Sequence, residues 1–333
     1  MQPEQRLITI TDNKNKIISF LKDLIIKPRV DIHKWAQISK QTPTLKIGYI
    51  GQHLASLILG MEGGRTGARG HDIVDGTEVK SCTKVDQADK CKDCDGRVMR
   101  SETECHHCGS TRIARKDDSK WLFSIRTDDE LNQLTTGISR IFLLISDYPK
   151  FSVGDFSSIR FEAFEIYPNS PRMAVFNSLL TDYYRNNYRP KADANQTTAP
   201  MNLHPYKLQF YLCNPIKVFS CIINQIDSPT PTIDILHYVE PKTDRSTLLS
   251  ENMPISILSK AEVVKFIENA PFNEVVLPLL ADKNLQKDEI LNLIRRTSIG
   301  WSNNIPFIDE KGRNHLTQRN VIVAPQKAKY LRN

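Results

Sequence analysis

Long hydrophobic runs are missing from this chain, and so is a secretory leader. No apolar run approaches the roughly 18 residues that a membrane-spanning helix needs. The first residues, MQPEQRLITITDNKNK, contain neither the apolar core nor the small-residue cleavage site of a signal peptide. We therefore expect a protein without a membrane segment that resides in the cytoplasm.

Motifs of several common enzyme classes are absent as well. The glycine-rich segment GGRTGARG has no Gly-Lys-Ser/Thr ending, so nucleotide binding of the P-loop kind is not expected. There is no Gly-x-Ser-x-Gly elbow, and no cysteine–histidine nucleophile pair stands out beyond the cysteine cluster described below. The chain also has no internal repeat. We expect Arg65 and Arg69 of the glycine-rich segment to contact a DNA backbone or only solvent.

Cysteine is scarce, and the charge is only moderately one-sided. Of the seven cysteines, four have metal-binding spacing, while Cys82, Cys213 and Cys221 suit reduced thiols of a cytosolic protein. The net charge of +7 results from 45 basic and 38 acidic residues. That balance suits a polyanionic partner but is equally compatible with an ordinary basic enzyme.

The pattern of apolar residues predicts an α/β or α+β core. The chain is long enough for two modest domains or one large domain with an insertion. A turn at the Lys-Pro-Arg sequence separates the first two helices, and Gly60 ends the third. Continuous apolar runs such as IFLLI suggest central strands covered on both faces. The expected helices cover 17–26, 31–40, 47–60, 129–135 and 172–185, and the expected strands cover 121–125, 141–146, 159–166, 208–213, 217–224 and 232–239.

Beyond residue 240 the pattern becomes helical, and we place a domain boundary there. The last helix carries Arg295 and Arg296 and would read a DNA groove if this region is winged-helix-like. A helical cap on the core or a dimerisation element fits the same pattern equally well. The expected helices of this C-terminal region, 241–333, cover 259–269 behind a serine cap, 273–281 and 286–296.

Two acids and a lysine lie close together in the segment DIVDGTEVKS. In a strand, residues two apart share a face, so Glu78 and Lys80 point the same way. A three-residue turn that ends at a left-handed Gly76 would make a β-hairpin and pair Asp72 with Glu78. A two-residue turn would leave Asp72 on the opposite face. The sequence permits the first register but does not force it.

These three side chains are a minimal set for cutting a phosphodiester bond with Mg²⁺. Two carboxylates can hold the ion through hard oxygen ligands and leave room for water and a phosphate oxygen. The ion would acidify the attacking water and neutralise developing charge, and Lys80 would orient that water or stabilise the same charge. The plain alternative is a surface hairpin that carries a Glu–Lys pair, because Glu-x-Lys alone is common.

The cysteine cluster is the strongest motif. Two Cys-x₂-Cys pairs are separated by ten residues, and two such knuckles complete a closed tetrahedral shell for a structural Zn²⁺. An iron–sulfur cluster or a redox pair is the competing interpretation. The nearby basic residues suit phosphate contacts or are simply exposed. The expected zinc ligands are Cys91, Cys94, Cys105 and Cys108, and the surrounding basic residues are Lys90, Lys92, Arg97, Arg100, Arg112, Arg115 and Lys116.

The segment DIVDGTEVKS, placed after a buried helix, resembles the PD-(D/E)xK nuclease superfamily. A longer set, KIGYIGQHLASLI, TEVKSC, KCKDC and KDDSKWLFS, resembles the MamI family of type II restriction endonucleases. The resemblance implies an α/β core, with a mixed sheet flanked by helices, in residues 1–240 and a zinc-binding insertion at 88–115. It further implies a Mg²⁺-dependent homodimer that cuts double-stranded DNA at a short interrupted palindrome, within a system that includes a DNA methyltransferase.

The resemblance also assigns the site residues. Asp72, Glu78 and Lys80 match the acid, acid and lysine of the superfamily motif. His71 stands where that motif often has proline, and the gap between the acids is short, which leaves Asp75 as a rival first acid. A residue on the preceding helix often joins the metal site. The candidates here are Gln52 and, on the loop, Glu62, although a solvent-facing role for Gln52 is the favoured interpretation.

Two other functions fit the same residues. A DNA repair or junction-resolving nuclease would use the same core and the same acids. A zinc-ribbon DNA-binding regulator would use only the cysteine cluster and the basic residues, with the Glu-x-Lys sequence playing no catalytic part.

Overall fold

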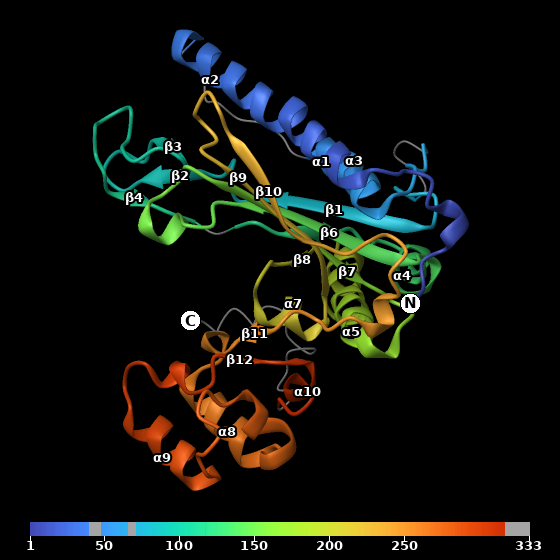
Figure 1. Ribbon diagram of the computed structural model, residues 1–333, viewed down its shortest axis with the longest axis vertical. Coiled ribbons are helices and arrows are strands. Elements are labelled where there is room, and N and C mark those ends of the chain that lie inside the picture. The colour runs from blue at the N-terminus through green and yellow to red at the C-terminus, as the bar shows by residue number, and fades with distance from the viewer. Residues whose placement is uncertain (40–47, 66–70, 117, 317–333) are drawn as a thin grey trace. The chain divides into compact units, whose positions relative to one another are not determined.

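The computed structural model describes residues 1–39, 48–65, 71–116 and 118–316 (Figure 1). The chain forms two compact units, and it crosses between them more than once. The first contains Met1–Leu122, Thr136–Tyr167 and Lys217–Ser246, and the second contains Phe123–Thr135, Pro168–Ile216 and Thr247–Asn333. The last crossing lies close to the boundary expected near residue 240, but two earlier segments also belong to the second unit.

A five-stranded mixed sheet forms the centre of the first unit, with the strand order β1-β6-β7-β9-β10. Strand β1 is parallel to β6, whereas β6–β7 and β9–β10 are antiparallel pairs. Every residue of β6 is buried, which confirms the central strand predicted from its continuous apolar run. The strands are β1 (Thr77–Thr83), β6 (Arg140–Asp147), β7 (Ile159–Ile166), β9 (Ile216–Asn224) and β10 (Thr232–Tyr238).

The first two predicted helices run on without the expected break. Helix α1 (Asn13–Leu21) continues through a π-helical turn, Lys22–Ile26, into α2 (Lys27–Ser39). The amide of Lys27 donates to the carbonyl of Lys22, five residues back, so the widened turn lies directly before Pro28, which has no amide to donate. The turn predicted at Lys-Pro-Arg is therefore wrong, because the π-helical turn accommodates the proline.

Helix α3 (Gly48–Leu59) packs closely on the sheet. A Cβ atom at Gly51 would lie 1.8 Å from Oγ of Ser81 on β1, so only glycine permits this approach. The inward residues, such as Leu54 and Ile58, are fully buried. Gly60 follows the helix with a φ of +68°, which confirms the predicted end.

One predicted strand is a helix. Residues 208–213 were expected to pair with 217–224, but α7 (Leu208–Leu212) is a short helix. Four successive residues, Leu208 to Tyr211, are buried, so the segment has no exposed face that would produce the alternation of a half-buried strand. The strands predicted over 217–224 and 232–239 are both present as β9 and β10, and they pair with each other, with a register shift between Ile235 and His237.

The second unit is mainly helical. Helix α8 begins behind Ser259, which forms a reciprocal capping box with Glu262, as the predicted serine cap requires. The segment predicted as helix 273–281 is a π-helical turn followed by a 3-10 turn. The α-helices and strands of this unit include α4 (Asp128–Asn132), α5 (Ala174–Tyr183), α6 (Arg189–Asp193), β8 (Met201–Leu203), α8 (Lys260–Asn269), α9 (Lys287–Arg296), α10 (Glu310–Arg313) and the antiparallel pair β11 (Met253–Pro254) and β12 (Phe307–Ile308).

The cysteine cluster lies in a small separate sheet within the first unit, ordered β3-β2-β4. Its strands are β2 (Ala88–Cys91), β3 (Arg97–Met99) and β4 (Ile113–Ala114). The chain then enters β5 (Trp121–Phe123), which fulfils part of the strand predicted over 121–125. Among the residues described, no helix is long and apolar enough to span a membrane.

Candidate active site and metal centre

The turn before β1 is tight but is not the predicted hairpin. The amides of Asp72 and Ile73 donate to the carbonyl of Thr77, and the amide of Gly76 donates to the carbonyl of Ile73. Ile73 forms an isolated antiparallel bridge with Gly63 instead of pairing along β1. The hairpin prediction is therefore wrong, because the chain turns away towards Gly63 and β1 takes β6 as its partner. The left-handed conformation predicted for Gly76 is confirmed by its φ of +86°.

Asp72 reaches β1 with its side chain instead of its backbone. Its Oδ2 accepts a hydrogen bond from the amide of Val79 at 2.7 Å, and its Oδ1 accepts one from Nε2 of Gln52 at 2.5 Å. Strand β1 is the first strand of the sheet, so this carboxylate lies at the edge of β1 that β6 leaves free. Helix α3, the turn and β1 thus meet at Asp72, and the carboxylate lies against the residue next to Glu78.

Glu78 and Lys80 share one face of β1, as the strand alternation predicts. Nζ of Lys80 lies 2.6 Å from Oε1 of Glu78, and the two side chains are 28% and 21% exposed, respectively. Thr77 and Val79 point to the other face and are buried. The acid and the lysine are therefore adjacent and reachable from solvent.

Asp75 is placed quite differently from Asp72. Its Oδ1 accepts hydrogen bonds from the amide of Thr77 at 3.1 Å and from the Thr77 hydroxyl at 2.6 Å. Its Oδ2 forms an ion pair with the guanidinium of Arg140, a side chain that is only 2% exposed. Sequence reasoning missed Arg140, although a lone arginine that opens the apolar run IFLLI is an unusual residue to bury.

Gln52 and Glu62, the two candidates for an additional metal ligand, differ in their partners. Gln52 lies on the exposed side of α3 and contacts Asp72, whereas Glu62 is exposed on the following loop with Oε2 3.9 Å from Nη2 of Arg65. Of the two candidates on the preceding segment, the structure brings Gln52 to the acids. Arg69 lies outside the described residues.

The four cysteines of the insertion meet at one point. Their sulfur atoms all lie within 4.8 Å of one another, with Sγ–Sγ separations of 3.6 Å for Cys91–Cys108 and 3.5 Å for Cys94–Cys105. Tetrahedral Zn²⁺ with Zn–S bonds of about 2.3 Å requires sulfur separations of about 3.8 Å. The donor set and its spacing therefore fit a zinc ion.

Each cysteine pair sits in a hydrogen-bonded knuckle. The amide of Cys91 donates to the carbonyl of Gly96, and the amide of Cys105 donates to the carbonyl of Ser110. A Cβ atom at Gly96 would lie 2.7 Å from the His107 ring and 3.2 Å from the Cys94 sulfur, so the first knuckle needs glycine. Glycine is thus required after the first cysteine pair because Gly96 has no room for a side chain. After the second pair, glycine is favoured because Gly109 has a left-handed φ of +69°.

The electrostatics of the cluster also favour a cation. The amide of Asp93 donates towards the Cys91 sulfur at 3.4 Å and, with the amide of Cys94, lowers the pKa of Cys91 to about 7. A backbone contact from Gly96 acts in the same direction on Cys94, but the neighbouring thiols outweigh it and raise the pKa of Cys94 to about 12. Four sulfurs this close oppose each other's ionisation unless a positive ion lies among them.

The sequence matches one known protein family over most of its length. A family model described as MamI restriction endonuclease matches residues 34–256. The chain belongs to this family. The match includes Gln52, Asp72, Glu78 and Lys80 as well as all four cysteines of the insertion.

The type II restriction enzyme MamI of Microbacterium ammoniaphilum is a curated relative of this MamI-family chain. It is 32% identical over 87 residues, which are 26% of this chain and 26% of the relative. The aligned part thus spans about a quarter of the relative's length. No solved structure matches the chain.

The described arginines that were expected to contact DNA near the acids and the insertion of this MamI-family chain fall into two groups, one paired inside the protein and one exposed. Arg100 and Arg115 turn inward and pair with the buried carboxylate of Asp89 at 2.9 and 3.0 Å. Arg97 and Arg112 are exposed on the insertion, although Arg112 lies 3.1 Å from Asp93. Arg65 is 88% exposed, so together with Arg97 and Arg112 it is accessible to a large anionic ligand.

Proposed function

We propose that the protein is a type II restriction endonuclease that hydrolyses phosphodiester bonds of double-stranded DNA at a short, interrupted palindromic site. Family membership supports the class of enzyme. The observation that carries the chemistry is the contact of the Asp72 carboxylate with the amide of Val79, the residue next to Glu78, together with the 2.6 Å separation of Lys80 and Glu78. Two hard carboxylates and an ammonium group at one edge strand are suited to hydrolysis of a phosphate ester.

In this proposal Asp72 and Glu78 hold a catalytic Mg²⁺. The bound ion would lower the pKa of an attacking water and offset negative charge on the phosphate. Lys80 would orient the water or stabilise the same charge, and its contact with Glu78 keeps the ammonium beside the acids. Gln52 fixes one oxygen of Asp72 from α3, so that helix contributes to the site through an amide.

The arrangement also supports a PD-(D/E)xK core. In the structure a helix packs on a mixed sheet, an acid follows in the next turn, and an acid-x-lysine sequence lies on the strand. The strand that bears Glu78 and Lys80 is parallel to its fully buried neighbour β6. The proposed catalytic residues are therefore held on the rigid part of the fold.

We further propose a structural Zn²⁺ on Cys91, Cys94, Cys105 and Cys108. Four protein thiolates close the coordination shell and leave no position for substrate. The exposed Arg97 and Arg112 would contact DNA phosphates, whereas Arg100 and Arg115 stabilise the insertion through Asp89.

The remaining parts of the proposal concern assembly and context. Arg295 and Arg296 lie on α9 and are exposed, with Arg295 at 2.5 Å from Glu268, so their contact with DNA is proposed for the bound state. A homodimer would read a palindrome with two identical surfaces. Such an enzyme would act on DNA in the cytoplasm, beside a methyltransferase that protects the host sites.

Digestion of plasmid DNA with Mg²⁺, followed by sequencing of the ends, tests this proposal. We expect a fixed fragment pattern, and we expect Glu78→Ala to lose at least about 10³-fold in cleavage rate while keeping its affinity for DNA. Glu104→Ala, at an exposed acid of the insertion, is a matched control that should cleave normally. Cleavage confined to branched or mismatched DNA would point to a repair nuclease, and tight duplex binding without any nicking would point to a regulator.

A further inference from the structure

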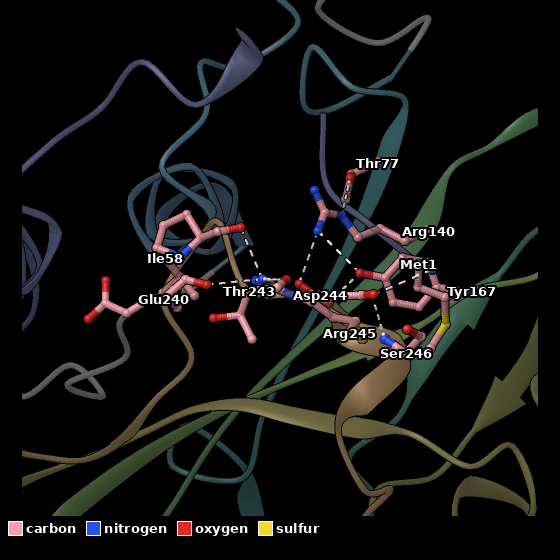
Figure 2. Close-up of polar contacts among 12 residues, drawn as sticks. Met1, Ile58, Thr77, Arg140, Tyr167, Glu240, Thr243, Asp244, Arg245 and Ser246 are labelled. Atoms are coloured by element: carbon pink, nitrogen blue, oxygen red, sulfur yellow. Dashed lines mark hydrogen bonds and ion pairs between the residues drawn. The ribbon is translucent and has the colours of Figure 1, made fainter. Parts of the chain in front are cut away.

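A buried group of charged and hydroxyl side chains lies under the turn that separates the two proposed metal-binding acids. Figure 2 shows the guanidinium of Arg140 between Thr77 and Tyr167, with Arg245 nearby. The guanidinium donates to the Thr77 hydroxyl at 2.7 Å and to Glu165 at 3.1 Å, and it pairs with Asp75. We call this group the Arg140 cluster; it consists of Asp75, Thr77, Arg140, Glu165, Tyr167 and Arg245.

The Arg140 cluster is balanced in charge and almost closed to solvent. Its two arginines face two carboxylates, and the side chains of Arg140, Glu165 and Arg245 are at most 2% exposed. Burial alone would lower the pKa of Arg140, but the charges of Glu165 and Asp75 raise it above the ordinary arginine value. For Tyr167, burial and the nearby charge of Glu165 both raise the pKa of the phenol. The phenol therefore stays protonated and donates to Glu165 at 2.6 Å.

Glu165 connects the cluster to the end of the first unit. Its second oxygen accepts from Nε of Arg245 at 3.2 Å, and Arg245 also donates to the carbonyls of Glu240, Pro241 and Thr243. Arg140 is therefore held from several sides and is a fixed anchor. A flexible surface charge would not hold Asp75 in one place.

Asp75 connects the fixed Arg140 side chain to the turn before β1. One of its oxygens accepts from both the amide and the hydroxyl of Thr77, while the other pairs with Arg140. The carbonyl of Gly76 accepts from the amide of Ser139, the residue before Arg140. The turn is thus tied to the start of β6 on both sides of Gly76.

This turn also sets the separation of the two proposed metal ligands, Asp72 and Glu78. Asp72 is the residue at which the turn begins, and Glu78 lies directly after its last residue, Thr77. The amide of Asp72 donates to the carbonyl of Thr77 and closes the turn. A displacement of Thr77 would shift Val79 and Glu78 along β1 relative to the carboxylate of Asp72. Metal affinity and hydrolysis depend on that separation, since small misplacements of ligands cost much of both.

We propose that Asp75 and Arg140 are positioning residues that hold Asp72 and Glu78 at the spacing a divalent cation requires. Asp75 is accordingly not a metal ligand, because its carboxylate is already paired with the buried guanidinium of Arg140, whereas among the described residues Asp72 accepts only from the uncharged amides of Gln52 and Val79. The inference rests on the proposed nuclease function and names which of the two rival acids supports the site and which binds the ion.

The test compares Asp75→Asn with Asp147→Asn in the zinc-loaded protein. Asp147 is the matched control because it lies at the other end of β6, is 11% exposed against 10% for Asp75, and pairs with Arg160 at 2.6 Å. The measurements are Ca²⁺ binding by calorimetry without DNA, and kcat, KM for DNA and the Mg²⁺ midpoint of cleavage. We expect Asp75→Asn to weaken Ca²⁺ binding and to lower kcat by about 10- to 100-fold each, with KM for DNA changed by less than about twofold.

The control should lose a similar amount of thermal stability but keep its Ca²⁺ affinity and kcat. Thr77→Val, which removes only the bridging hydroxyl, should give a smaller shift in the same direction and serves if Asp75→Asn does not fold. Equal Ca²⁺ affinities in the two aspartate variants would overturn the inference. So would a loss of Ca²⁺ binding in Asp75→Asn as complete as in Asp72→Asn, because Asp75 would then be a ligand. Failure of the wild-type protein to cut DNA would refute the proposed function itself and would be seen before any variant is compared.

Discussion

At the scale of single residues, the site separates acids that look interchangeable in the sequence. Asp72 and Asp75 both precede Glu78 by a few positions, yet one contacts Gln52 and Val79 and the other contacts Arg140. The two acids occupy different places in the turn that Gly76 closes with its left-handed backbone: Asp72 lies at its start and Asp75 within it.

Gln52 provides a prediction at this scale. We expect Gln52→Ala to lower the cleavage rate by about 3- to 10-fold, because one hydrogen bond to a partly exposed carboxylate is worth roughly 1 kcal/mol. The melting temperature should barely change, since the amide is exposed. Single-turnover cleavage measures the effect, and Gln196→Ala, at another exposed glutamine, is the control. An unchanged rate in Gln52→Ala would show that the contact with Asp72 has no part in catalysis.

At the scale of elements, we expect the cysteine insertion to depend on its proposed zinc ion more than the central sheet does. Its apolar cluster consists of the buried Val98 and the half-buried Ile113 beside two buried cysteines, which is too little to fold a segment of this length. The buried pair of Arg100 and Asp89 adds specificity, but breaking up the knuckles would expose it to water. The central sheet has an extensive apolar core of its own.

Removal of zinc should therefore unfold the insertion first. Structural zinc sites of this kind contribute about 10–16 kcal/mol of apparent binding free energy, far more than this small core can replace. We expect verified metal removal to lower the melting temperature and to expose amides of 88–116 in hydrogen exchange, while β6 stays protected. Zinc should restore both signals and Mg²⁺ should not. Unchanged melting after complete metal removal would argue against a structural site.

At the scale of the whole molecule, the two compact units are built from interleaved segments. The first holds the sheet, the proposed catalytic acids and the insertion, and the second holds most of the remaining helices. The family match runs from residue 34 to residue 256 and thus covers segments of both units. The match therefore includes part of each unit, while residues 257–333 of the second unit lie outside it.

The proposed homodimer gives a prediction at this scale. Light scattering should report twice the 38.1 kDa of one chain, at least in the presence of DNA. A mixture of wild-type and Glu78→Ala chains should form dimers with one active site, which nick a single strand of the site. Nicked circles should then accumulate on a plasmid with one site. Full double-strand cleavage by a demonstrated monomer would contradict the proposal.

Features that depend on neighbours a few residues apart could be predicted from the amino-acid sequence alone. These are the left-handed Gly76, the shared face of Glu78 and Lys80, the end of α3 at Gly60, and the zinc-binding spacing of the four cysteines. Local sterics and strand alternation are enough to specify them. The hairpin and the break at Lys-Pro-Arg failed because a distant or unusual backbone partner outweighed the local pattern. The strand at 208–213 failed because four successive buried residues leave no periodic pattern that separates a strand from a helix.

Which charged residues are available for function depends on long-range packing, which the sequence pattern does not show. Asp75 finds its partner 65 positions away in Arg140, and Arg115 finds Asp89 across 26 positions, so both look like free surface charges in the sequence. Burial makes such pairs obligatory, because a charge removed from water must be compensated by another charge. Asp72, in contrast, lies at the edge of β1 beside Glu78, where a cation can still reach it. The motif thus specified the kinds of side chain, and the packing of β1 against β6 and α3 separated the residues that support the site from those proposed to act in it.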